Sequence, residues 1–146
     1  MSDNPRIEPT TTAVFGAVQT GEIDVSHLNL RPDAREAVEQ LPAGSALLVV
    51  QRGPNVGARF LLNSDTVSVG RKTSSDIFLD DVTVSRKHAQ FYRLPSGGWG
   101  VRDAGSLNGT YVNRDRVDDV ELSGGDEVQI GKFRMTYHPS LAGALQ

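Results

Sequence analysis

Short runs of β-favouring residues, separated by turn-forming residues, fill most of the chain after residue 45 and restrict the folds that it can adopt. The runs are rich in Val, Ile, Leu, Phe, Tyr and Thr, and they cover residues 46–50, 59–62, 66–69, 76–79, 88–92, 99–102, 110–112, 127–130 and 133–137. Short strands at this spacing, with no helical pattern between them, indicate an all-β sandwich or barrel. We expect about ten to eleven strands, with the last two joined by a tight hairpin at Gly131-Lys132.

The first 45 residues have a different composition. They hold seven acidic residues against three arginines, and Phe15 is their only aromatic residue. Such a segment buries too little apolar surface to offset its ordering entropy, so we predict a mostly disordered acidic N-terminal tail over residues 1–45. One local alternative is a short helix with Asp33 as its cap, Glu36 at the third position and Pro42 beyond its end. We expect the folded domain over residues 46–138 and a C-terminal tail over 139–146.

Three polar clusters lie where strand runs give way to loops: Gly70-Arg71, Ser85-Arg86-Lys87-His88 and Asn108-Gly109-Thr110. Arginine offers a rigid fork of N–H donors, lysine adds charge and serine adds a hydroxyl group, and together they suit a phosphate group. The Asn108 amide both donates and accepts, so it suits a peptide backbone. Gly70 favours a sharp turn or a close approach of the backbone to a ligand. The clusters predict a binding site at the loop tips of a β scaffold.

On this β background, Gly70-Arg71, Ser85-x-x-His88 and Asn108-Gly109 resemble, in the same order, the forkhead-associated (FHA) domain, which reads phosphothreonine peptides. The resemblance covers residues 46–137 and implies an FHA-type β-sandwich. The phosphopeptide-binding residues that it implies are Arg71, Ser85, Arg86, Lys87, Ser106, Leu107 and Asn108, and the structural residues within the site are Gly70, His88 and Gly109.

The resemblance also implies a role for each of these residues. Arg71 and Ser85 would contact the phosphate, with help from Arg86 or Lys87, and Asn108 would hold the peptide backbone beside the phosphothreonine. His88 would brace the loop that carries Ser85, while Ser106 and Leu107 would line the groove. Residues near Arg114 would read the side chain three positions after the phosphothreonine.

Longer stretches of the chain are similar to one branch of this family, the GarA/OdhI proteins of actinobacteria. The similar stretches are residues 43–50, 76–86, 105–114 and 129–134. In that branch a tail threonine within Glu-Thr-Thr-Ser-Val-Phe is phosphorylated and then binds the FHA domain of the same chain. The equivalent here is Thr10-Thr11-Thr12-Ala13-Val14-Phe15, in which Thr10 replaces the glutamate and Ala13 replaces the serine. The implied phosphorylation sites are Thr11 and Thr12.

This resemblance implies a regulator of metabolism rather than an enzyme. The unphosphorylated protein would bind and regulate the 2-oxoglutarate dehydrogenase complex and, in some members, glutamate dehydrogenase and glutamate synthase. Once a Ser/Thr protein kinase modified the tail, the protein would bind its own tail and release these partners. We expect a cytoplasmic monomer. The runner-up is an adaptor that binds phosphothreonine on other proteins without self-inhibition.

Other classes of function receive little support from the sequence. The chain has no cysteine and a net charge of −3, and it contains no apolar run of the roughly twenty residues that span a bilayer. We therefore expect no nucleic-acid or membrane partner, no metal and no cofactor. Gly70-Arg71-Lys72-Thr73 lacks the earlier glycine of a nucleotide-binding phosphate loop, because Asp65 stands there. A small hydrolase that uses Ser85 and His88 remains a third hypothesis, although no orienting partner is evident.

Overall fold

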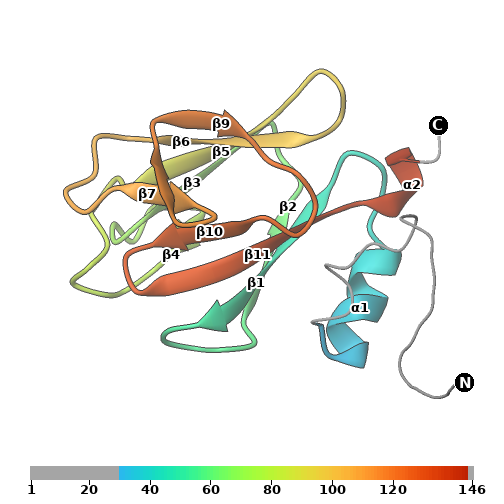
Figure 1. The fold of residues 1–146 in the computed structure, drawn as a ribbon, viewed down its shortest axis with the longest axis horizontal. Coiled ribbons are helices and arrows are strands. Elements are labelled where there is room, and N and C mark those ends of the chain that lie inside the picture. Colours follow the sequence, from blue (N-terminus) through green and yellow to red (C-terminus); the bar gives the residue numbers. More distant parts are fainter. Residues whose placement is uncertain (1–29, 145–146) are drawn as a thin grey trace, which may run out of the picture.

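The computed structural model describes residues 30–144, which form a sandwich of two β-sheets (Figure 1). The order of the first sheet is β2-β1-β11-β10-β7-β8 and that of the second is β4-β3-β5-β6-β9. The strands of the first sheet are β1 Ala46–Arg52, β2 Arg59–Leu62, β7 Thr110–Val112, β8 Asp115–Val117, β10 Glu127–Ile130 and β11 Phe133–Pro139. Those of the second are β3 Thr66–Gly70, β4 Ile77–Phe78, β5 Ala89–Arg93, β6 Trp99–Asp103 and β9 Asp119–Glu121. The eleven strands of the described residues confirm the predicted all-β sandwich.

Strand β1 is buried on both faces, which explains the uninterrupted apolar run at residues 46–50. Successive side chains of a strand point to opposite faces of its sheet. Leu48 and Val50 belong to the core between the two sheets, whereas Leu47 and Val49 belong to a second apolar cluster outside it. The strand pairs with β2 on one side and β11 on the other, so its backbone hydrogen bonds are satisfied along both edges.

The second apolar cluster is formed by helix α1, Pro32–Glu39, which covers the outer face of β1 (Figure 1). Proline is favoured in the first turn of a helix because its nitrogen has no proton to leave unpaired. The predicted cap was wrong: Arg31 occupies the N-cap position without a side-chain hydrogen bond, and Asp33 lies inside the first turn. The Asp33 carboxylate instead pairs with the guanidinium of Arg59 at 3.2 Å.

Part of the predicted tail segment 1–45 is therefore packed against the sandwich. Leu30, Ala34, Val38 and Leu41 are buried in the second cluster. Residues 1–29, with Thr11 and Thr12, lie outside the described residues. The physical reason for the difference is that a few apolar side chains at helical spacing suffice when a strand supplies the opposing surface.

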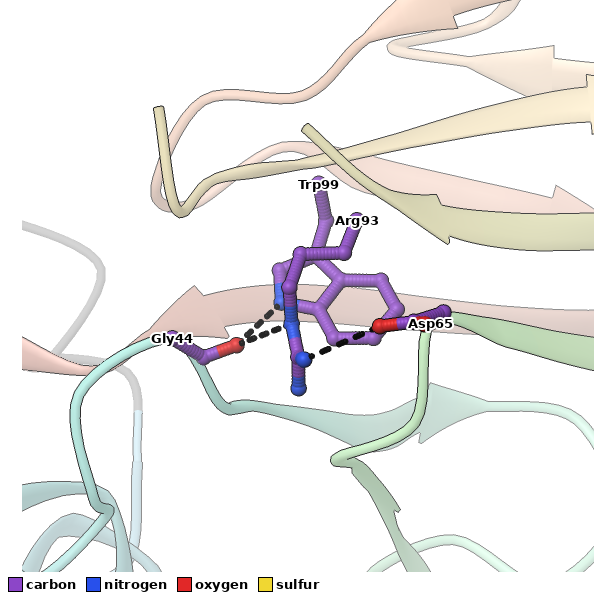
Figure 2. A network of polar contacts seen from close by, with 4 residues as sticks. All are labelled: Gly44, Asp65, Arg93 and Trp99. Atoms are coloured by element: carbon purple, nitrogen blue, oxygen red, sulfur yellow. Dashed lines mark hydrogen bonds and ion pairs between the residues drawn. The ribbon is translucent and has the colours of Figure 1, made fainter. Parts of the chain in front are cut away.

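Trp99 and Arg93 attach the segment that precedes β1 to the sandwich. The indole Nε1 of Trp99 and the Nε of Arg93 both donate to the carbonyl of Gly44, at 3.0 and 3.2 Å (Figure 2). The Arg93 guanidinium lies 5.2 Å from the Trp99 ring centroid and also pairs with Asp65 at 3.3 Å. Trp99 is fully buried, and the bond to Gly44 gives its N–H group a partner.

The C-terminal end is also attached to this region, although residues 139–146 were predicted to form a tail. Strand β11 runs to Pro139, and the short helix α2 covers Leu141–Ala144. The hydroxyl of the buried Ser140 donates to the carbonyl of Leu41 at 2.9 Å. Among residues 30–144, no helix is long and apolar enough to cross a membrane.

Candidate phosphopeptide site

Two loops that follow strands β3 and β4 run side by side and carry two of the three predicted clusters. The Arg71 amide donates to the carbonyl of Ser85 at 2.9 Å, and the Lys72 amide donates to the carbonyl of Arg86 at 3.2 Å. A Cβ atom on Gly70 would lie 2.0 Å from the Arg86 carbonyl oxygen, so only glycine fits there. Gly70 thus allows a close approach between two parts of the same chain, not the approach to a ligand that the sequence suggested as one possibility.

Arg71 is exposed and held in place by one hydrogen bond. Its Nε donates to the carbonyl of Val84 at 3.0 Å. Within residues 30–144, its two terminal nitrogens have no protein acceptor, so they are available as a pair of donors toward solvent. A guanidinium fixed in this way is suited to charge-assisted hydrogen bonds with phosphate oxygens.

Ser85 joins its own loop to the loop that carries Asn108. Its hydroxyl oxygen accepts a hydrogen bond from the Leu107 amide at 2.9 Å, which leaves the hydroxyl proton able to donate to a ligand. Its amide donates to Nδ1 of His88 at 3.0 Å. Ser85 therefore has a fixed position beside Arg71 and retains one donor.

His88 is fully buried beneath these loops. Because Nδ1 accepts from Ser85, the ring proton lies on Nε2, which donates to the carbonyl of Gly109 at 2.9 Å. Both ring nitrogens are thus occupied by backbone groups. His88 has the bracing geometry that the resemblance implied, and it offers no free nitrogen to activate the Ser85 hydroxyl as the hydrolase hypothesis would require.

Asn108 is exposed at the tip of the β6–β7 loop. Its amide nitrogen donates to the carbonyl of Thr83 at 2.9 Å, which orients the side chain and leaves its carbonyl oxygen as an acceptor. Leu107, next to it, is 85% exposed. Both side chains are placed where an extended peptide could lie along the loop tips.

Ser106 is buried below the loop surface, in contrast to the groove-lining role implied for it. Its hydroxyl donates to Asp103 and accepts from the Gly109 amide at 2.9 Å. The Asp103 carboxylate also accepts from the hydroxyl of Thr110 at 2.7 Å and from the amides of Gly105 and Ser106. Burial alone raises the pKa of Asp103, but these hydrogen bonds outweigh it and hold the pKa below its ordinary value.

A groove of about 520 Å³ opens beside Asn108 on the outer side of the first sheet. Its lining residues are Thr83, Asn108, Gly109, Tyr111, Arg114, Gln129, Gly131, Lys132 and Arg134. The lining contains three cationic side chains and no carboxylate. Arg114 lies in the turn between β7 and β8 at a φ of 72° and lines this groove together with Asn108.

Sequence reasoning did not identify Thr83, Lys132 or Arg134. Thr83 connects three loops, because its carbonyl accepts from Asn108, its hydroxyl accepts from the Lys132 amide at 3.0 Å and its amide donates to Asp81 at 2.9 Å. The hydrogen bonds from Thr83 lower the pKa of the Asp81 carboxyl. Asp81-x-Thr83 is a typical local turn motif, and this motif could have identified Thr83 from the sequence.

Arg86 and Lys87 are both exposed, but they do not join Arg71 and Ser85 through any hydrogen bond or ion pair of the described residues. Lys87 lines a separate hollow together with Lys72. Across the part of the chain that the structure covers, no three His, Asp or Glu side chains gather where they could hold a metal ion.

Comparisons with known proteins identify the fold and its relatives. The FHA domain family matches residues 67–131. The solved structure of the FhaA FHA domain, in complex with the intracellular domain of Rv3910, has a TM-score of 0.57 and 26% identity over 63% of this chain and 98% of its own. A structure from a study of phosphothreonine-dependent FHA domain interactions has a TM-score of 0.58 and 26% identity over 64% of this chain and 95% of its own.

Two curated relatives match nearly the whole chain. The glycogen accumulation regulator GarA of Mycolicibacterium smegmatis is 59% identical over 87% of this chain and 80% of its own length. The oxoglutarate dehydrogenase inhibitor of Corynebacterium glutamicum is 54% identical over 94% of this chain and 96% of its own. Both are named as regulatory proteins, in agreement with the prediction that the chain is not an enzyme. The chain belongs to the family of FHA-domain regulators that includes GarA and the oxoglutarate dehydrogenase inhibitor.

Proposed function

We propose that the chain is a phosphothreonine-dependent switch that regulates metabolic enzymes. The observation that carries this proposal is the convergence of Arg71, Ser85 and Asn108 at one end of the sandwich. Each side chain is oriented by one hydrogen bond to the protein and retains donors or acceptors toward solvent. A phosphate between Arg71 and Ser85 would form charge-assisted hydrogen bonds, each worth about 1.5–3 kcal/mol.

The phosphate comes, in this proposal, from Thr11 or Thr12 of the same chain. Phosphorylation by a Ser/Thr protein kinase adds about −1.5 to −2 charges and three acceptor oxygens. Thr12 lies eighteen residues before Leu30, where the described domain begins. A flexible chain of that length averages roughly 25 Å end to end, so the tail reaches the loop tips of a small domain. The tether supplies an effective concentration on the order of millimolar.

The partners are metabolic enzymes, by analogy with the relatives. One relative is named an oxoglutarate dehydrogenase inhibitor, so the unphosphorylated chain is proposed to bind the 2-oxoglutarate dehydrogenase complex in the cytoplasm. Glutamate dehydrogenase and glutamate synthase are proposed as further partners, and the chain is proposed to act as a monomer. The closed, phosphorylated form would cover the loop tips and release the partners.

The direct test uses full-length chain with phosphothreonine incorporated at position 11 or 12. Amide NMR spectra should show shifts at Arg71, Ser85 and Asn108 relative to the unmodified chain. The same modified chain with Arg71→Ala should lack these shifts, because the phosphate loses its main donor. Unchanged spectra for both modified chains would exclude self-binding.

An adaptor function is the second candidate, and one observation favours it. The FhaA FHA domain of similar fold was solved in complex with the intracellular domain of another protein. Capture of metabolic enzymes on immobilised chain separates the two functions. The switch requires that phosphothreonine at position 11 or 12 releases the captured enzyme, whereas an adaptor retains it. Arg71→Ala in the phosphorylated chain tests whether that release depends on phosphate binding at Arg71 and Ser85.

A further inference from the structure

A second basic hollow lies next to the phosphate site and is not used by it. Its volume is about 270 Å³, and it is lined by Ser68, Val69, Lys72, Ser74, Ser75, Lys87, Ala89, Gln90 and Ala104. The lining combines two lysines with three serine hydroxyls and one side-chain amide, and it has no carboxylate. Lysine and serine are common ligands of carboxylate and phosphate groups.

The hollow and the phosphate site are built from the same pair of loops but from different residues. Lys72 follows Arg71 directly, and the two loops are held together by backbone bonds from Arg71 to Ser85 and from Lys72 to Arg86. Arg71 donates to Val84 and does not line the hollow, whereas Lys72 and Lys87 do. Arg71 and Lys72 are consecutive in the chain, with Cα atoms about 3.8 Å apart, so the hollow adjoins the phosphate site.

The two lysines have no acidic partner among residues 30–144. No carboxylate of these residues lies within 4.0 Å of either ammonium group. The nearby Asp76 carboxylate is occupied by Ser68, accepting from its amide at 2.9 Å and from its hydroxyl at 3.3 Å. The hollow therefore presents uncompensated positive charge beside the Arg71–Ser85 site.

The tail contains one carboxylate close to the predicted phosphorylation sites. Between Asn4 and Gly21, Glu8 is the only acidic residue, and it lies three positions before Thr11. Three residues of extended chain span about 10 Å, which is enough for the side chain at position 8 to reach a hollow that adjoins the phosphate site. We propose that the Lys72–Lys87 hollow binds the Glu8 carboxylate when the phosphothreonine of the same tail occupies the Arg71–Ser85 site. This inference rests on the proposed function and adds a second anchoring point to it.

The test is a double-mutant cycle on the full-length, unphosphorylated chain. Peptides of residues 5–17 carry phosphothreonine at position 11 or 12, and each is made with the native Glu8 and with the substitution Glu8→Gln. They are titrated against the wild-type chain, the double variant Lys72→Met/Lys87→Met and the control Lys132→Met, which removes a lysine from the groove beside Asn108 rather than from the hollow. An exposed ion pair changes affinity by only about two- to fivefold, so binding is measured at low salt.

The wild-type chain should bind the native peptide about two- to fivefold more tightly than the peptide with Glu8→Gln. The double variant should lose this preference, and Lys132→Met should keep it. An equal effect of Glu8→Gln in all three proteins would overturn the inference. Arg71→Ala serves as the reference for the proposed function: if it binds the phosphopeptides as well as the wild type, the phosphate site itself is wrong.

Discussion

His88 donates from Nε2 to the carbonyl of Gly109 at 2.9 Å, and this buried bond joins the loop of Asn108 to the loop of Ser85 from below. The opposite ring nitrogen accepts from the Ser85 amide at 3.0 Å. The imidazole ring thus bridges the Ser85 amide and the Gly109 carbonyl. Because the ring is fully buried, water cannot replace either bond.

Replacing His88 with leucine should destabilise the domain and weaken phosphopeptide binding together. Leucine keeps most of the volume but leaves the Ser85 amide and the Gly109 carbonyl without partners, at about 1–3 kcal/mol for each buried group. Guanidinium denaturation should show a total loss of about 2–6 kcal/mol. Ser85→Ala is the comparison, because it removes only the hydroxyl and should lower binding much more than stability. Equal stability of His88→Leu and the wild type would contradict the bracing role.

The contact between Gly70 and Arg86 predicts a strong dependence on the size of one residue. An alanine Cβ would lie 2.0 Å from the Arg86 carbonyl oxygen, so the two loops must move apart. Gly70→Ala should lower stability by about 3 kcal/mol and displace Arg71 relative to Ser85. Gly98→Ala is the matched control, because its Cβ would meet only side chains at 3.7 Å. Thermal melts and phosphopeptide titrations of both variants test the difference.

The sequence was sufficient for the sandwich and for the three clusters because both depend on local signals. The alternating runs and the Gly131-Lys132 hairpin were visible, and Ile130 pairs with Phe133 as that hairpin requires. Strands β8 and β9 were missed, since each has three residues with charged members and pairs through the backbone rather than through an apolar pattern. Their strand character comes from the neighbouring strands β7 and β6.

The site residues that were not predicted also depend on contacts between segments that are distant in the sequence. Lys132 and Arg134 lie more than twenty residues after Asn108 in the sequence, and the pairing of β10 with β7 and with β11 places them in one groove. Ser106 is a small polar residue of the kind that lines grooves, but its hydroxyl donates to Asp103 and its side chain is buried. Such relationships depend on tertiary contacts that no local pattern encodes.

The hydrogen bonds to Asp103 predict a pH-dependent contribution to stability. Because the pKa of Asp103 in the folded protein lies below its ordinary value of 3.8, its ionised form favours folding. That contribution is complete above about pH 5 and is lost as the pH falls through the ordinary value of 3.8 toward the folded-state pKa. Asp103→Asn should lower stability by about 1–3 kcal/mol at neutral pH, with a difference that shrinks in acid. A difference that stays constant between about pH 7 and pH 2 would show that ionisation of Asp103 contributes nothing.

Helix α1 should detach from the sandwich without unfolding it, because its apolar cluster is separate from the main core. Val38 is fully buried at the centre of that cluster, and an aspartate there would place a charge in an apolar contact. In Val38→Asp, amide exchange should rise roughly tenfold or more in residues 32–41 and stay slow in β5 and β6. Glu36→Asp, on the exposed face of the helix, should leave exchange unchanged. Detachment would lengthen the tether from Thr12 to the domain from about 18 to about 33 residues and lower the effective concentration of a phosphorylated tail only about 2.5-fold. Global loss of protection in Val38→Asp would show instead that the helix and the sandwich fold as one unit.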